Sequence, residues 1–227
     1  MRRSAPAGFT LVEILVVISV LGLLMSLLVP AMGKARATAN DVKCRSNLRQ
    51  WGVALSLYMN NNGGFIPRRG QGDRVLAKVD RGDDWFNCLP PYFNELPYNE
   101  LVKQGRRPRA GDDSIFICPS ADDTGGKYFL PYAMNQFLSP WHITDPHQIM
   151  SLPEPAKVVF LGDGPGPYAS IMPIAKPYCV EPRHDGRANL LFLDGHVESF
   201  TGEYLGCGVG DPMRDDVVWQ VGDGYDE

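Results

Sequence analysis

The chain has 227 residues, of which 44% are hydrophobic and 21% are charged, so it is long enough for one folded domain and an additional element. Its net charge of −4, without any run of lysine and arginine, excludes a protein that binds nucleic acid through a basic surface.

The N-terminal region begins with a short leader, residues 1–8, that contains Arg2 and Arg3 and no apolar core. It is followed by an apolar segment, residues 9–29, whose single charged residue is Glu13. As a helix this segment would be roughly 31 Å long, enough to cross the hydrocarbon core of a membrane. It is too long for a cleavable secretory signal peptide, so we predict a single-pass anchor. The two arginines predict a cytoplasmic N-terminus and an extracytoplasmic body.

Glu13 is not explained by a plain anchor, because an unpartnered carboxylate in hydrocarbon costs several kcal/mol. The sequence GFTLVE at residues 8–13 resembles the class III signal of type IV pilins and type II secretion pseudopilins. The resemblance implies that a prepilin peptidase cleaves between Gly8 and Phe9 and N-methylates Phe9. It also implies that Glu13 neutralises the terminal amine of a neighbouring subunit during assembly, a charge-assisted contact in a medium of low dielectric constant.

Beyond Pro30 the pattern remains helical but becomes amphipathic. An apolar stripe at spacings of four and three residues consists of Cys44, Leu48, Trp51, Leu55 and Tyr58. We predict one long helix from about residue 9 to 60, whose outer half packs against a sheet. The chain is then divided into a leader (1–8), a transmembrane half-helix (9–29), an extracytoplasmic half-helix (30–62) and a pilin-like globular domain (63–227).

Residues 64–112 are rich in glycine, proline and charge, and they predict a loop-rich insertion with a short helix near residues 94–104. Its aromatic residues either recognise a partner or cover the core; they are Trp85, Tyr92, Phe93 and Tyr98. Five later runs predict the strands of an antiparallel sheet, and hence an α+β fold. These runs are Ser114–Cys118, Lys157–Leu161, Asn189–Leu193, His196–Phe200 and Val217–Val221.

The third and fourth of these runs are joined by Asp194-Gly195, which predicts a two-residue type I′ hairpin turn. This turn would place Phe192 opposite Val197, with both side chains and Leu190 on the core face.

His184 precedes Asp194 by ten positions, and Gly195 completes an H-x9-D-G arrangement. It resembles the motif of a large subgroup of prepilin-like proteins. Cys44, Trp85 and the CPS sequence at residues 118–120 also resemble that subgroup.

Candidate metal ligands of the types that bind transition metals are Asp163, His184, Asp194 and His196. A Ca²⁺ site is a second alternative, because pseudopilins often carry one and the tail contains Asp211, Asp215, Asp216 and Asp223, although without EF-hand spacing. The third alternative is structural, with Asp194 in a turn and His184 ordering the preceding segment, and without a cofactor. Nucleophile-elbow, zincin and Walker motifs are lacking in the sequence, so we do not expect an enzyme.

Five widely spaced cysteines form no C-x-x-C pair, which argues against a zinc ribbon or a thioredoxin-like motif. In an exported domain they allow up to two disulfides with one cysteine left over, and their pairing is undetermined. They are Cys44, Cys88, Cys118, Cys179 and Cys207.

Three functional hypotheses follow. The first is a structural subunit of the bacterial inner membrane that prepilin peptidase processes. It would assemble with other pilin or pseudopilin subunits into a type II secretion pseudopilus or a type IV pilus-like filament. The second is a membrane-tethered extracytoplasmic binding module that does not polymerise. The third, a metal-dependent extracytoplasmic enzyme, rests only on the four candidate metal ligands.

Overall fold

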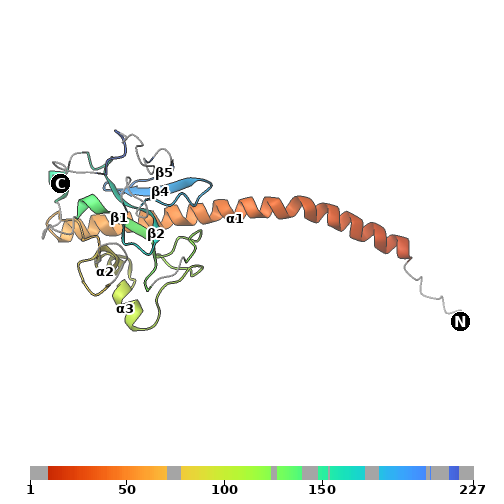
Figure 1. Cartoon of the computed structure of the whole chain (residues 1–227), viewed down its shortest axis with the longest axis horizontal. Coiled ribbons are helices and arrows are strands. Elements are labelled where there is room, and N and C mark those ends of the chain that lie inside the picture. The colour runs from red at the N-terminus through yellow and green to blue at the C-terminus, as the bar shows by residue number, and fades with distance from the viewer. Residues whose placement is uncertain are drawn as a thin grey trace, which may run out of the picture. The chain divides into compact units, whose positions relative to one another are not determined.

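The computed structural model describes residues 10–70, 78–123, 127–139, 148–152, 154–171, 179–202, 205 and 215–219. It contains one long helix, α1 (Leu11–Asn61), and a five-stranded sheet (Figure 1). The chain divides into two compact units, residues 1–39 and 40–227, so that α1 contributes to both. The predicted α+β class, with a long N-terminal helix packed on a mostly antiparallel sheet, is confirmed.

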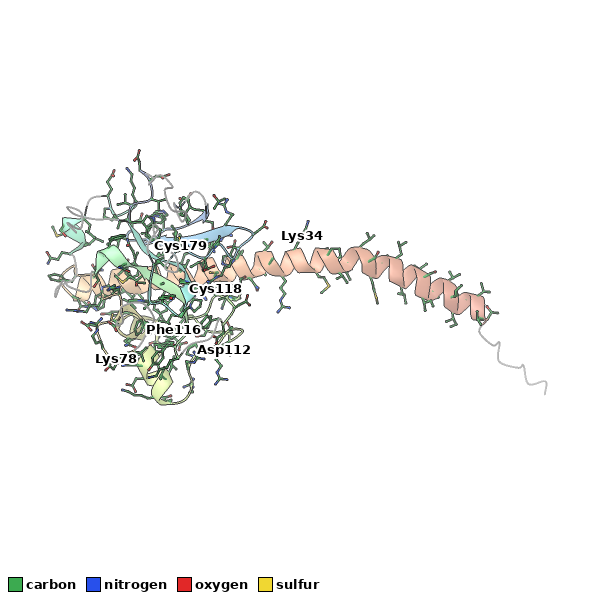
Figure 2. The ribbon with its side chains drawn as sticks, in the orientation of Figure 1. Lys34, Lys78, Asp112, Phe116, Cys118 and Cys179 are labelled. Atoms are coloured by element: carbon green, nitrogen blue, oxygen red, sulfur yellow. The ribbon has the colours of Figure 1, made fainter. Side chains whose placement is uncertain are left out.

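In the first unit the side chains from Thr10 to Ala39 are all exposed (Figure 2). The helix continues through Pro30, whose ring removes one backbone donor without ending the helix. The hydroxyl groups of Ser19 and Ser26 donate to backbone carbonyls of the preceding turn, those of Val16 and Leu23. These two polar groups are therefore satisfied within the helix itself, as an apolar environment requires.

In the second unit α1 buries one stripe, as its amphipathic pattern predicts. Its buried side chains include Cys44, Leu48, Trp51 and Leu55, each with no exposed surface. The helix ends near Asn61, and Gly63 and Gly64 follow with φ of 63° and 81°, a backbone conformation that glycine adopts without strain.

The sheet has the strand order β3-β1-β2-β4-β5. Its members are β1 (Leu130–Asn135), β2 (Val159–Gly166), β3 (Ser170–Ile171), β4 (Arg187–Phe192) and β5 (Val197–Thr201). Three pairings are antiparallel, and the short β3 pairs with β1 in parallel. The predictions of β2, β4 and β5 are confirmed with shifted ends, whereas β1 and β3 were not predicted.

Two of the predicted strands are wrong in the described residues. Residues 114–118 form turns, in which Ile117 N–H donates to Ser114 O at 3.0 Å. Near the C-terminus, Val218 makes only an isolated parallel bridge with Val158, and residues 220–221 lie outside the described residues.

Both faces of the sheet are covered. One face contributes Met134, Leu161 and Leu191 to the core cluster that contains the buried stripe of α1. The other face packs beneath C-terminal residues that include Val217 and Trp219. Because both faces are apolar, β1 and β2 are buried almost throughout, and an alternating pattern is lost there.

The turn between β4 and β5 differs from the predicted type I′ turn. Only Gly195 has positive φ, 93°, and its N–H donates to Phe192 O at 3.0 Å. Phe192 N–H in turn donates to His196 O at 3.0 Å, so the loop contains three residues, with glycine at the left-handed position. Phe192 therefore lies opposite His196 and not opposite Val197.

This one-residue difference reverses the predicted face of Val197. Val197 pairs with Leu191 and packs in the cluster that contains α1. Leu190 and Phe192 belong to the opposite cluster. A change of one residue in register exchanges the two faces of a strand, and here it corrects the prediction that Leu190, Phe192 and Val197 share one face.

The region predicted as a loop-rich insertion contains two short α-helices, α2 (Trp85–Cys88) and α3 (Tyr98–Lys103), and the 3-10 helix η1 (Pro90–Phe93). Trp85 and Tyr98 are completely buried. The Trp85 ring lies edge-on to Trp51 of α1, with centroids 5.2 Å apart. These two aromatic side chains therefore belong to the core, as the second of the two interpretations predicts.

Candidate functional site

The N-terminal end of α1 carries a reciprocal hydrogen-bond arrangement around Glu13. Its Oε2 accepts from Thr10 N–H at 2.8 Å and from the Thr10 hydroxyl at 2.7 Å. Glu13 N–H donates to Thr10 Oγ1 at 3.2 Å, which completes a capping box. Sequence reasoning noted Glu13 but not this local role, although the T-x-x-E spacing was visible. Gly8 and Phe9, the predicted cleavage junction, lie outside the described residues.

A second candidate site lies inside the body. Four side chains from four different segments bring one potential ligand atom each to within 4.8 Å of one another, and all four are buried. Cys44 comes from α1, Cys118 from the loop between α3 and β1, Asp163 from β2, and His184 from the segment before β4. Cys118 is labelled in Figure 2. We call these four residues the thiol–imidazole cluster.

The cluster is closely connected. Cys44 Sγ donates to Asp163 Oδ1 at 3.3 Å, and Cys118 Sγ lies 3.3 Å from His184 Nε2. His184 Nε2 lies 3.4 Å from Asp163 Oδ2. These contacts link both thiols, the imidazole and the carboxylate in one buried polar group, which the surrounding apolar core isolates from water.

His184 is positioned by a tight turn. Asp185 and Gly186 have φ of 54° and 75°, and the N–H and C=O groups of His184 and Arg187 exchange hydrogen bonds of 2.9 and 3.1 Å. Positive φ at both central residues is the signature of a type I′ turn. The Asp-Gly pair that adopts this turn thus lies before β4 and not, as predicted, after it.

Charged and polar neighbours surround Asp163. Arg183 Nη1 lies 3.9 Å from Oδ1, and Asn189 N–H donates to Oδ2 at 2.8 Å. His184 Nδ1 is buried without a hydrogen bond, and Asp41 Oδ1 is 3.6 Å away from it.

The cluster shifts the pKa values of its two thiols in opposite directions and raises that of its imidazole. Burial raises the pKa of the Cys44 thiol well above its usual range. The pKa of the Cys118 thiol is lowered to about 6, first by its hydrogen bond with Cys44 and then by that with His184, although burial opposes ionisation. Burial also opposes protonation of His184, but contacts with Asp163 and Cys118 outweigh it and raise the pKa of the imidazole to about 10. Two chemical states are therefore accessible: a thiolate–imidazolium pair, or two thiolates with a neutral imidazole around a cation.

The predicted metal ligands fall into two groups. The structure brings Asp163 and His184 together and adds Cys44 and Cys118, which sequence reasoning did not consider as ligands. Asp194 and His196 are outside this cluster. Their Oδ1 and Nδ1 atoms pair at 2.6 Å in the loop between β4 and β5, where both side chains are partly exposed.

The H-x9-D-G spacing has a structural meaning in this chain, because it spans β4. His184 lies before the strand, beside Cys44 and Asp41 of α1. Gly195 lies after it, and its backbone is 3.2 Å from where a Cβ on Gly52 of α1 would be. The two ends of the motif thus lie beside two different parts of α1, near Cys44 and near Gly52.

The structure gives less information about the other cysteines and about the acidic residues suggested for Ca²⁺. Cys44, Cys88 and Cys118 are free thiols, Cys179 is buried, and Cys207 lies outside the described residues. Of the acidic residues suggested for Ca²⁺, Asp215 and Asp216 are exposed, whereas Asp211 and Asp223 are outside the described part of the chain.

Comparison with known proteins identifies the N-terminal segment and much of the body. Residues 3–29 match the family described as the prokaryotic N-terminal methylation motif. Type II secretion system core protein G of Klebsiella michiganensis is 38% identical over 143 residues, which cover 57% of this chain and 98% of that protein. The protein of the same name from Pseudomonas aeruginosa is 32% identical over 119 residues, covering 48% and 82%. That from Klebsiella pneumoniae is 35% identical over 92 residues, covering 40% and 65%.

No solved structure matches the chain significantly. The helix α1 is long and apolar enough to cross a membrane, and no residue of its most apolar window is buried. Pseudopilins are structural filament subunits and not enzymes. The near-complete coverage of a relative at 38% identity, together with the methylation motif, shows that this chain belongs to the family of type II secretion system core protein G, the pseudopilins of the type IV pilin-like superfamily.

Proposed function

We propose that the chain is a subunit of a type II secretion pseudopilus, anchored in the bacterial inner membrane and assembled with other pseudopilins through the first half of α1. The observation that carries the proposal is the exposure of every side chain from Leu11 to Ala39 of α1, which apart from Glu13 in its first turn is apolar on all sides up to Val29. Such a surface requires lipid or other subunits around it. Type IV pilus-like filaments use the same chemistry, but the relatives are named for the secretion system.

We further propose the following topology. Residues 1–8 are a leader on the cytoplasmic side, held there by Arg2 and Arg3, and residues 9–29 span the membrane. Residues 30–62 and the globular domain, 63–227, are extracytoplasmic. Prepilin peptidase cleaves between Gly8 and Phe9 and methylates the new terminus, which the match of residues 3–29 to the methylation motif supports.

The proposed role of Glu13 is to pair with a terminal amine. In the isolated chain its Oε2 accepts both bonds from Thr10, the residue next to the proposed new terminus. The other oxygen, Oε1, is available for a second donor. An ammonium group on a neighbouring copy would neutralise the carboxylate in hydrocarbon, and this would favour subunits that are staggered so that one terminus meets the next Glu13.

Substitutions at Glu13 test this role. Glu13→Gln keeps an acceptor for Thr10 and removes the charge, whereas Glu13→Leu removes both. We expect both variants to insert into the membrane at normal levels and to enter filaments at least about tenfold less efficiently, since each 1.4 kcal/mol changes an equilibrium about tenfold. Ser26→Ala, in the same apolar segment, is the matched control and should assemble normally. Normal incorporation of Glu13→Leu would refute the role.

Substitution of Gly8 tests the processing step separately. In Gly8→Leu we expect the intact mass of the membrane-bound protein to retain residues 1–8. The wild-type mass should correspond to a chain that begins at Phe9 and carries one methyl group. Cleavage of Gly8→Leu at the same junction would refute the proposed site without affecting the assembly argument.

The binding-module hypothesis has less support. Its motivation was a set of exposed aromatic side chains, but Trp85 and Tyr98 are completely buried. Tyr92 and Phe93 are half-buried and pack against the main core cluster. They therefore contribute to folding in this chain.

A further inference from the structure

We propose that the thiol–imidazole cluster binds one divalent transition metal ion, with Zn²⁺ as the best chemical match, and that this ion fastens α1 to the sheet and its loops. Two cysteines, one histidine and one carboxylate are ligands that Zn²⁺ accepts in proteins. The proposal does not depend on the filament role, because all four ligands belong to the globular unit, residues 40–227.

The distances between potential ligand atoms are close to those of a tetrahedral site. Zinc bonds of about 2.3 Å to sulfur and about 2.0–2.2 Å to nitrogen and oxygen place ligands about 3.4–3.8 Å apart. His184 Nε2 is 3.3 Å from Cys118 Sγ and 3.4 Å from Asp163 Oδ2, and Cys44 Sγ is 3.3 Å from the other Asp163 oxygen, Oδ1. One of the two carboxylate oxygens would be the ligand atom of Asp163. All four ligand atoms lie within 4.8 Å of one another, so only small side-chain rotations would be needed to surround an ion.

The neighbours of the cluster supply what an occupied site requires. Two thiolates and one carboxylate exceed the charge of a divalent ion by one negative charge. The guanidinium of Arg183, 3.9 Å from Asp163 and largely buried, provides the compensating positive charge. Without an ion, the four side chains lie in a largely apolar core and rely on one another and on the neighbouring polar groups of Arg183, Asn189 and Tyr132, whose hydroxyl donates to Cys44 Sγ at 3.3 Å.

The second nitrogen of His184 provides an independent observation. Its Nδ1 is buried without a hydrogen bond and faces Asp41 Oδ1 at 3.6 Å. A histidine that binds a metal through one nitrogen usually donates its other N–H to a carboxylate, a backbone carbonyl or water, which fixes the ring. Coordination through Nε2 would make Nδ1 the donor, and a small shift would bring it within hydrogen-bond distance of Asp41.

The ion would join four segments that are far apart in the sequence. Cys44 belongs to α1, Asp163 to the central strand β2, and His184 to the turn that precedes β4. Metal binding does not depend on the filament role, but its mechanical value does: a filament subunit pulled through its N-terminal helix would transmit force to the body along α1. The site lies where α1 enters the core, because the buried stripe begins at Cys44. A metal there would hold the helix against the sheet under that force.

The test uses the full chain, purified in detergent under reducing conditions from cells grown with added Zn²⁺. We expect about one zinc ion per chain to remain bound through gel filtration, and Co²⁺ substitution to produce thiolate-to-cobalt charge-transfer absorption. Cys118→Ser and His184→Gln should lose the ion and the absorption. Asp41→Asn should keep the ion with an affinity lower by about 10–100-fold, because it removes only the orienting carboxylate.

Two variants are matched controls. Cys88→Ser removes a cysteine outside the cluster, and His196→Asn removes a histidine that pairs with Asp194 in the loop after β4. Both should bind zinc as the wild type does. If the ligand variants fail to fold, the decision rests on the wild type with and without a chelator. Because Cys44 and Cys118 are already buried, zinc should slow their alkylation further than in the chelator-treated protein and leave the rate at Cys88 unchanged.

Three results would overturn the proposal. The first is a folded wild-type chain that contains no zinc and gains none. The second is zinc retained by folded Cys118→Ser with wild-type affinity. The third concerns a parallel sample purified without reductant: an intact mass lower by two hydrogens, with Cys44 and Cys118 joined in one peptide pair, would show that the two thiols form a disulfide instead.

Discussion

The two halves of α1 have the same backbone conformation and opposite surroundings. From Leu11 to Val29 the helix is apolar on every side apart from Glu13 in its first turn, and all of its side chains are exposed. From Cys44 to Met59 it is apolar along one stripe, whose members are almost completely buried except for Tyr58, which is half-buried. The second half therefore has its partner within the chain. Under the proposed function, the first half obtains its partner from outside, first from lipid and then from other subunits.

This contrast shows why secondary structure alone does not distinguish an anchor from a core helix. Both halves satisfy their backbone hydrogen bonds internally, as a helix does in water or in lipid. The distribution of apolar side chains around the axis separates them, because a continuous apolar surface fits a surrounding solvent and a stripe fits a single neighbour.

The largest difference between the two halves should appear when one leucine in each half is truncated to alanine. Leu48→Ala removes a side chain with no exposed surface and should lower the free energy of unfolding of the body by about 2–5 kcal/mol. Leu24→Ala, where the side chain is 58% exposed, should change it by less than about 0.5 kcal/mol. Denaturant unfolding of the full chain in detergent measures both. Equal losses would contradict the separation of the two halves.

A second difference concerns carboxylates. Glu13 lies on an exposed helix end, whereas Asp84 is completely buried, and burial raises the pKa of Asp84 to about 6 despite its bond with Arg81. Between the unfolded value of 3.8 and about 6 the folded state binds more protons, so this group lowers stability as pH rises through that range.

Asp84→Asn should remove this dependence. Relative to wild type, the variant should gain up to about 3 kcal/mol of stability between about pH 3.5 and about pH 7, from about 1.4 kcal/mol per unit of pKa shift. Unfolding at several pH values measures the difference, and Asp113→Asn, with its side chain 88% exposed, is the control. Identical pH profiles for the two variants would contradict the assignment.

The smallest expected difference in stability is between alanine substitutions of two glycines of α1. A Cβ on Gly52 would lie 2.9 Å from Leu191 Cδ1 and 3.2 Å from the backbone of Gly195, so Gly52→Ala should destabilise the body by about 1–3 kcal/mol. A Cβ on Gly33 meets nothing within 4 Å, and Gly33→Ala should be neutral or stabilising by up to about 1 kcal/mol. Thermal unfolding of both variants in detergent gives the comparison. A neutral effect of Gly52→Ala would contradict the difference between the two halves of α1.

Local patterns predicted much of the fold. The length of the apolar run and the stripe at Cys44–Tyr58 predicted α1 nearly to its last residue, and β4 and β5 follow from apolar runs bounded by turn residues. β1 was missed because its sequence, LPYAMN, contains a proline and no β-branched residue. Its strand conformation depends on pairing with β2 and β3, which are distant in sequence.

The site was predicted only in part, for a similar reason. Asp163 and His184 have side chains that bind metals, and their residue types alone marked them as candidates. Cys44 and Cys118 join them through tertiary packing, without the short C-x-x-C spacing by which zinc sites are usually recognised. Of the two Asp-Gly pairs that flank β4, only Asp194-Gly195 was predicted to form a type I′ turn, although the sequence does not distinguish it from Asp185-Gly186, which adopts that turn. Either turn type suits the dipeptide, and the strand register decides between them.

The most direct test of the central claim is site-specific photocrosslinking in the membrane of intact cells. A photoreactive residue replaces either Leu24 or Val53, which are 58% and 62% exposed on the first and second halves of the same helix. We predict that position 24 crosslinks to other copies of the chain and that Glu13→Leu abolishes this product, whereas position 53 gives much less of it. Absence of self-crosslinks at position 24, with the chain present in the membrane, would contradict assembly through the first half of α1.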